Sequence, residues 1–92
     1  MSDAPRDYQA EADTVLAHFT AGLEPGEASL ALSVLLGRAA TRLHNVARGE
    51  ATARKGGADW PAWAGLQNAT RNLVLQASTC RDLAARLVGR RK

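Results

Sequence analysis

Few side chains in this sequence could carry out chemistry, and their spacing brings none of them together in a local motif. Neither His18 nor His44 has a cysteine or carboxylate three or four residues away, the spacing that would place a metal-ligand or relay pair on one helix face. The single cysteine, Cys80, falls in an apolar repeat, where we expect a buried and unreactive thiol. Gly56-Gly57 lacks the Lys-Ser/Thr that completes a phosphate-binding loop. The sequence therefore predicts a non-enzymatic protein that uses no metal, cofactor or small-molecule substrate.

The composition favours an all-α fold. The 92 residues include 19 alanines, 12 leucines and no isoleucine, and such a composition favours helix over strand. A core built mostly of alanine and leucine leaves a chain of this length near marginal stability, so help from a protein partner or a second copy is expected. No apolar run is long enough to cross a membrane, and one cysteine fits a reducing compartment, so we expect a cytoplasmic protein.

Helix start and stop signals divide the chain into three helices within a single domain covering residues 1–92. Asp3 can cap a short helix over about 5–21, and Pro25 and Gly56-Gly57 bound a long helix over about 25–55. Pro61 opens another long helix over about 60–88, followed by a basic tail at 89–92. Gly37 could interrupt the first long helix. We predict an antiparallel hairpin of the two long helices with the short N-terminal helix against it, as a three-helix bundle.

Apolar residues at helical spacing predict which sides of the helices are buried. The main apolar stripe of the 25–55 helix consists of Ala28, Leu32, Leu35, Leu36, Ala39, Leu43 and Val46. The expected seam of the 60–88 helix alternates by three and four through Trp63, Leu66, Thr70, Leu73, Ala77, Cys80, Ala84 and Leu87. Leu30 and Val34 lie on another side of their helix, and we expect the N-terminal helix to cover them.

Charge is distributed unevenly along the chain. Residues 1–27 carry a net charge of −5 and residues 28–92 a net charge of +8, which together give the overall +3. Either the acidic N-terminal helix neutralises the basic hairpin by lying on it, or the hairpin offers its cations to phosphate groups.

One hypothesis from the sequence is that the chain binds nucleic acid. The segment from Leu32 to Arg48 resembles a DNA-binding helix-turn-helix, with Gly37 at the turn and Leu36, Leu43 and Val46 at its apolar positions. Arg38 stands where that motif usually has an apolar residue. The candidate nucleic-acid contacts, from this motif and from the basic hairpin around it, are Arg38, Thr41, Arg42, Asn45, Arg48, Arg54 and Lys55.

Another hypothesis comes from the tripeptide Trp63-Ala64-Gly65. In a helical hairpin of about this length, a W-x-G resembles the secreted W-x-G proteins of type VII systems, which implies export and a two-helix hairpin. Two features depart from that family. Its W-x-G lies in the turn between the helices, whereas here the motif falls inside the last helix, and its C-terminal Tyr-x-x-x-Asp/Glu signal is missing because the single tyrosine is Tyr8.

The hypothesis that the sequence favours most is a small helical module that binds a protein partner or a second copy of itself. Alanine-rich helices leave little core, so exposed large apolar side chains are the natural contact points. The candidate interface residues are Leu30, Val34, Trp60, Trp63 and Leu75.

Overall fold

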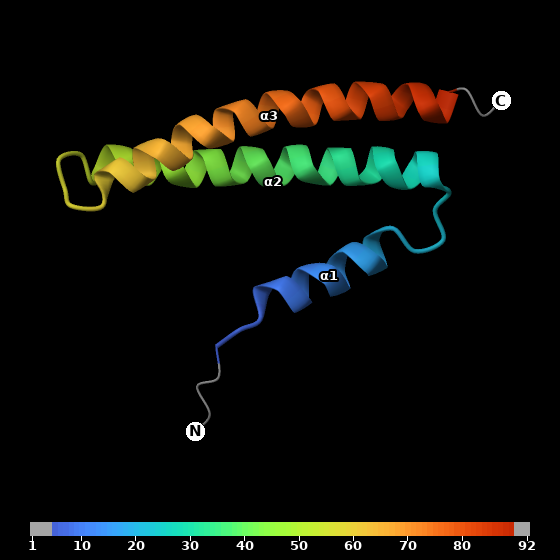
Figure 1. Ribbon diagram of the computed structural model, residues 1–92, viewed down its shortest axis with the longest axis horizontal. Helices are drawn as coiled ribbons and strands as arrows, with labels where there is room; N and C mark the ends of the chain where they lie inside the picture. The colour runs from blue at the N-terminus through green and yellow to red at the C-terminus, as the bar shows by residue number, and fades with distance from the viewer. Residues whose placement is uncertain (1–4, 90–92) are drawn as a thin grey trace.

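The computed structural model describes residues 5–89 and confirms an all-α chain of three helices. They are α1 (Tyr8–Phe19), α2 (Pro25–Ala53) and α3 (Trp60–Gly89). The long helices α2 and α3 lie side by side and antiparallel, joined by the loop at 54–59 (Figure 1). The predicted hairpin is therefore confirmed, with each helix end within a few residues of its expected place. The proposed cap Asp3 and the tail residues 90–92 lie outside the described residues.

Local signals explain where α2 begins and ends. The backbone N–H of Glu24 donates to the Glu27 side chain at 3.3 Å in a capping box, and Pro25 occupies the first turn. After α2, Gly56 adopts a φ of +84°, which glycine reaches without steric cost, and the loop turns there. Between these ends α2 is continuous, so the alternative of a break at Gly37 is wrong.

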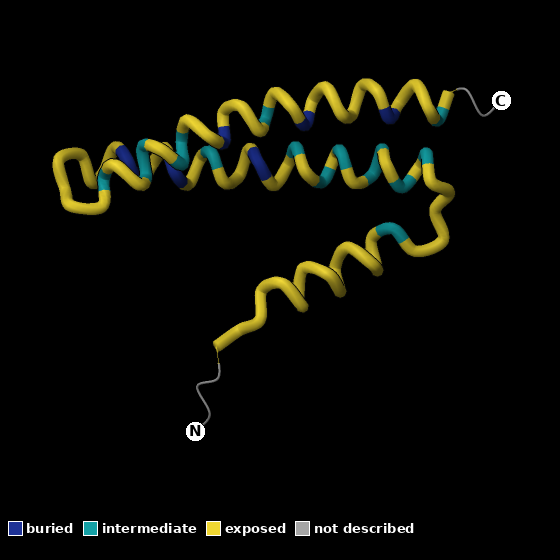
Figure 2. Tube along the Cα trace, viewed as in Figure 1, coloured by how far each residue is buried: buried dark blue, intermediate teal, exposed yellow. Residues whose placement is uncertain are grey.

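Small residues form the seam between α2 and α3. On each helix the residues facing the partner alternate by four and three, as in an antiparallel coiled coil. The fully buried residues are Ala40, Ala47 and Ala51 on α2 and Thr70, Ala77 and Ala84 on α3 (Figure 2). Half-buried residues complete the two series, namely Gly26, Leu30, Ser33, Gly37 and His44 on α2 and Trp63, Gln67, Val74 and Val88 on α3. The largest fully buried side chain is that of Thr70, so the hairpin core is thin.

The His44 side chain makes polar contacts across this seam. The Nδ1 atom of His44 lies 2.9 Å from Thr70 Oγ1 and 3.1 Å from the carbonyl oxygen of Gln67. Thr70 Oγ1 also lies 2.8 Å from the carbonyl oxygen of Leu66, to which it donates. Because a carbonyl oxygen can only accept, the arrangement that satisfies every group places a proton on His44 Nδ1. The contact therefore joins the two helices at one fixed register.

Most of the leucines that were expected in the seams do not face the other helix. Leu32, Leu36, Leu43 and Val46 are exposed, although their stripe was expected to be buried. On α3 the expected seam is correct at Thr70, Ala77 and Ala84 and wrong at Leu73, Cys80 and Leu87, which are exposed. The physical reason is that the predicted series mixed two neighbouring heptad positions, and the position with the small residues lets the helices approach more closely.

Helix α1 stands apart from the hairpin. It contains no buried residue, and its apolar residues Tyr8, Val15, Leu16 and Phe19 are exposed, so it does not cover α2 as expected. All three helices lie in one flat layer of 55 × 39 × 13 Å (Figure 1). The radius of gyration is 16.9 Å, above the roughly 12 Å of a compact chain of this length, which confirms an elongated shape.

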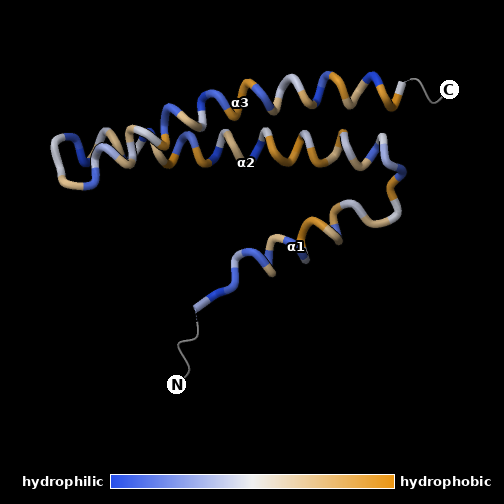
Figure 3. The backbone as a smooth tube through the Cα atoms, in the orientation of Figure 1, coloured by the Kyte–Doolittle hydropathy of each residue, from blue (hydrophilic) through white to orange (hydrophobic). Residues whose placement is uncertain are grey.

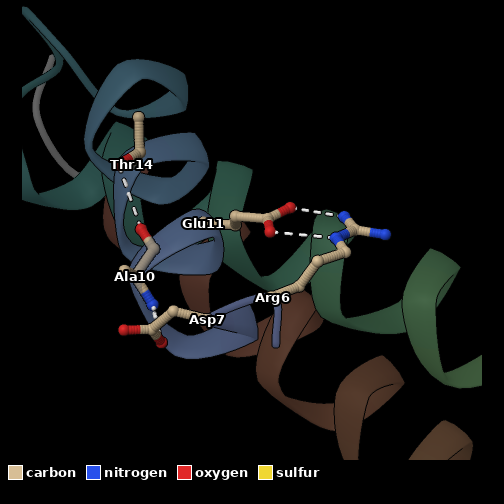
Figure 4. A network of polar contacts seen from close by, with 5 residues as sticks. All are labelled: Arg6, Asp7, Ala10, Glu11 and Thr14. Atoms are coloured by element: carbon tan, nitrogen blue, oxygen red, sulfur yellow. Dashed lines mark hydrogen bonds and ion pairs between the residues drawn. The ribbon is translucent and has the colours of Figure 1, made fainter. Parts of the chain in front are cut away.

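Contacts within its own first turn define α1 (Figure 4). Asp7 caps the helix by accepting from the backbone N–H of Ala10 at 3.0 Å, in the role that the sequence suggested for Asp3. The Arg6 guanidinium forms a two-point ion pair with Glu11, with Nε donating to Oε2 at 3.0 Å. This hydrogen bond lowers the pKa of the Glu11 carboxyl below its ordinary value. Helix α1 is thus held by local contacts and not by burial.

Candidate interaction surface

A second apolar repeat lies beside the buried seam on each long helix. Its members again alternate by three and four, and we call them together the apolar face. They are Leu32, Leu36, Ala39, Leu43 and Val46 on α2, and Ala62, Leu66, Ala69, Leu73, Gln76, Cys80, Leu83 and Leu87 on α3. The seven exposed leucine and valine side chains among them are each 36–53% exposed. Two columns of large apolar side chains are therefore left without a cover.

The two columns lie on the same side of the hairpin. The opposite flanks of the seam meet in a groove that contains Thr41 from α2 and Ser78 from α3. Each helix has two flanks beside the seam, and one flank of each helix lines this groove. In an antiparallel pair of right-handed helices, the second flank of each helix must therefore point to the opposite side of the hairpin. On that side Leu36 and Leu43 run beside Leu73 and Cys80. Figure 3 shows that apolar segments recur along both helices.

The apolar face carries no charge. From residue 32 to 46 on α2 and from 62 to 87 on α3, none of its members is acidic or basic. Its most polar members are Gln76 and Cys80, and Cys80 is exposed instead of buried as the sequence predicted. An uncharged double column of this kind is typical of a surface that packs against other helices.

The other side of the hairpin is polar and basic. A shallow groove of about 370 Å³ between α2 and α3 is lined by Ser33, Val34, Gly37, Arg38, Thr41, Val74, Ala77, Ser78 and Arg81. Arg81 also approaches the Asp82 carboxylate at 3.8 Å. Arg38 and Arg81, one from each helix, thus line the same groove as the hydroxyl groups of Ser33, Thr41 and Ser78. We call this the polar groove.

The structure separates the predicted nucleic-acid contacts into several places. Arg38 and Thr41 line the polar groove, and both also line a hollow on the outer side of α2 with Arg42 and Asn45. Arg48 is exposed further along α2 and Lys55 lies in the loop. Because α2 is unbroken, the segment from 32 to 48 does not form the two helices of a helix-turn-helix.

Arg54 is engaged at the loop. Its Nε atom donates to Glu50 Oε1 at 2.7 Å and its Nη1 atom to Asp59 Oδ2 at 2.9 Å. These carboxylates raise the pKa of Arg54 above its ordinary value, the hydrogen bond to Glu50 contributing most. The guanidinium also lies 5.9 Å from the centre of the Trp63 ring. Arg54 therefore closes the hairpin loop and is less available for phosphate than the sequence suggested.

The predicted interface residues do not form one surface. Leu30 is half-buried in the seam, and Trp60 and Trp63 are half-buried where α3 begins. Val34 borders the polar groove, and Leu75 is 63% exposed on a different side of α3 from the apolar face. The tripeptide 63–65 lies within α3 and not in the connecting turn.

Sequence reasoning missed the apolar face because it assigned these leucines to the core. A signal was present in the heptads. On α3 the series from Thr70 to Ala84 steps by seven through small residues, beside a second series from Leu66 to Leu87 that steps by seven through mostly large ones. Two adjacent repeats on one helix are typical of a helix that packs against two neighbours.

Metal binding and membrane insertion are the two further functions that the described residues test. Among residues 5–89, no three histidine, cysteine or acidic side chains lie close enough to hold a metal ion. No helix in the same range is long and apolar enough to span a membrane. The chain matches no protein-family model, and no curated protein sequence or solved structure is significantly similar to it.

Proposed function

We propose that this chain is a non-enzymatic interaction module that binds another protein through its apolar face. The observation that carries the proposal is the exposed, uncharged double column of mainly leucine side chains on a hairpin whose fully buried residues are only alanines and one threonine. Because these leucines are already about half covered, each one that a partner buries completely adds roughly half of the ~1.5–3 kcal/mol that burial of a fully exposed leucine gives. Helical partners fit such a surface because their own apolar stripes repeat at the same spacing. The single cysteine makes the cytoplasm the compartment that we propose.

Photo-crosslinking in the native host tests this function. A photoreactive amino acid replaces Leu43 on the apolar face, and the matched control carries it at Leu75 on another side of the hairpin. We expect irradiation to give discrete protein adducts from position 43 and far fewer from position 75. Adducts to this chain itself and adducts to another protein both support the proposal. Equal yields from both positions, or none from position 43, would contradict it.

A second candidate function rests on the polar groove. Arg38, Arg81, Thr41 and Ser78 all line it, which gives cations and hydroxyl donors within one groove. Phosphate groups bind to such sets of donors, and nucleic-acid binding through them weakens as salt rises. Because the polar groove and the apolar face lie on opposite sides of the hairpin, one chain could use both.

A further inference from the structure

We infer that the partner on the apolar face is a second copy of this chain, with two hairpins packed face to face into a four-helix bundle. The inference rests on the proposed function and names its partner. Two-fold symmetry would place the same surface on both sides of the interface, so that every apolar column meets another. All neighbouring helices in such a bundle are antiparallel, as α2 and α3 already are.

The exposed area of the chain supports this inference. The chain exposes 7125 Å², whereas a compact monomer of 9.8 kDa exposes about 5,200 Å². The excess is roughly 1,900 Å², and part of it belongs to the separate helix α1. A stable dimer takes about 800 Å² or more from each chain. The excess is the exposed area of α1 together with that of the uncovered hairpin, whose apolar face leaves seven leucine and valine side chains 36–53% exposed.

The hairpin core gives an independent reason. No leucine, valine or aromatic side chain is fully buried among residues 5–89, and the largest buried side chain is that of Thr70. Five buried alanines contribute little apolar area against the ordering entropy of two helices of 29 and 30 residues. Packing two apolar faces together would supply the missing layer of leucines. We therefore expect folding of the hairpin and association to be coupled.

The chain's own α1 is too short to be the cover. Its 12 residues span roughly 18 Å, whereas the apolar face from Ala62 to Leu87 spans roughly 38 Å. The hairpin of a second copy matches this length, because it presents the same two columns. No member of the apolar face is charged, so two copies can meet on it without placing like charges opposite each other, although Arg42 lies beside Ala39 at its edge. An acidic partner, by contrast, would find no complementary charge on this face.

Sedimentation equilibrium of the purified full chain tests the inference without any substitution. We expect a mass of twice 9.8 kDa that falls toward one chain on dilution, and a melting temperature that rises with protein concentration. A single-chain mass at every concentration, with a melting temperature that does not change, would overturn the inference. In that case adducts to a different protein in the crosslinking experiment would leave the proposed function standing.

Charge substitutions locate the interface. Leu43→Lys and Leu87→Lys each place an ammonium group on the apolar face at a side chain that is half exposed in the single chain. Leu75→Lys is the matched control on another side of α3. We expect the two face variants to weaken association by about thirtyfold or more and the control to leave it unchanged. Equal association by all three variants, or weaker association only in Leu75→Lys, would overturn the inference.

Alkylation of Cys80 gives a readout that does not depend on a variant folding. The thiol is exposed in the single chain and lies within the α3 column, between Gln76 and Leu83. We expect a maleimide to react with it several-fold more slowly as protein concentration rises, and at the same rate at all concentrations in denaturant. Concentration-independent reaction of the native chain would overturn the inference. The inference would also be overturned if the chain stayed monomeric and bound anionic lipid vesicles through the apolar face.

Discussion

His44 on α2 and Thr70 on α3 are joined by a contact of 2.9 Å between Nδ1 and Oγ1, in a seam that is otherwise built mainly of small apolar residues. The contact holds the helices in register because a slip by one turn would separate the two groups and leave the Nδ1–H of His44 without these acceptors. Polar pairs inside an apolar seam are known to fix register at some cost in stability.

A double-mutant cycle measures this contact. We expect His44→Ala, Thr70→Val and the double variant to give a coupling energy of about 0.5–1.5 kcal/mol in the free energy of unfolding. Chemical denaturation at one fixed protein concentration is the measurement. Additive effects of the two substitutions would show that the contact does not stabilise the native seam.

Gly37 offers a stabilising substitution. A Cβ atom built at this position would lie 3.8 Å from Ala77 Cβ, which is ordinary van der Waals contact. Because α2 is continuous there, Gly37→Ala should raise the free energy of unfolding by about 0.5–1 kcal/mol.

Gly49→Ala is the matched control, since it lies on the same helix with no atom near the added methyl group. Both variants should melt at a higher temperature than the parent by similar amounts. A destabilised Gly37→Ala beside a stabilised Gly49→Ala would mean that the helices are closer at Gly37 than the structure places them.

Helix α1 should contribute little to the stability of the hairpin. A chain that begins at Leu23 lacks α1, which buries no residue, so its melting temperature should stay within a few degrees of that of the full chain. In hydrogen exchange, amides of α1 should exchange far faster than those of α2 and α3, because an isolated helix of 12 residues is marginal in water. Protection of α1 equal to that of α2 would contradict this expectation.

The helicity of α1 should depend on pH through Glu11. Its pKa is lowered in the folded helix by the hydrogen bond from Arg6, so the ion pair stabilises α1 above the ordinary glutamate value of about 4.3. This stabilisation is lost as the pH falls through the lowered pKa. Cα chemical shifts of Ala10 and Ala12 should therefore move toward coil values in acid. Glu11→Gln is the control, and its α1 should lack that component of the change.

Salt dependence separates the polar groove from the apolar face. If the groove binds nucleic acid, Arg38→Ala with Arg81→Ala should weaken binding and reduce the slope of log affinity against log salt by about one unit for each phosphate that the variant no longer binds. The control is Arg54→Ala, since Arg54 is already paired with Glu50 and Asp59. Fluorescence anisotropy with a labelled duplex at several salt concentrations is the measurement. No binding at low salt would eliminate this second function.

The helices could be predicted from sequence because their signals are local. Pro25, Gly56 and Pro61 mark helix ends wherever the chain goes next, and each lies within a few residues of an observed boundary. The side of each helix that is buried in the seam could not be predicted in the same way. Leucine is more apolar than alanine, so a single-chain reading places Leu36 and Leu43 inside, whereas Ala40 and Ala47 occupy the seam. The two adjacent heptad repeats indicate two apolar sides on each helix, but only the spatial relation between the helices shows which repeat forms the seam.

The position of Arg54 has a consequence for how the hairpin folds. One guanidinium holds Glu50 at the end of α2 and Asp59 just before α3, so these contacts close a loop of very few residues and cost little chain entropy. Pairing can then spread residue by residue from the loop toward Pro25 and Gly89, as each step brings the next small residues together. We expect the loop end to be structured in the folding transition state and the far end to form last. Arg54→Ala should therefore slow refolding more than it accelerates unfolding in stopped-flow measurements.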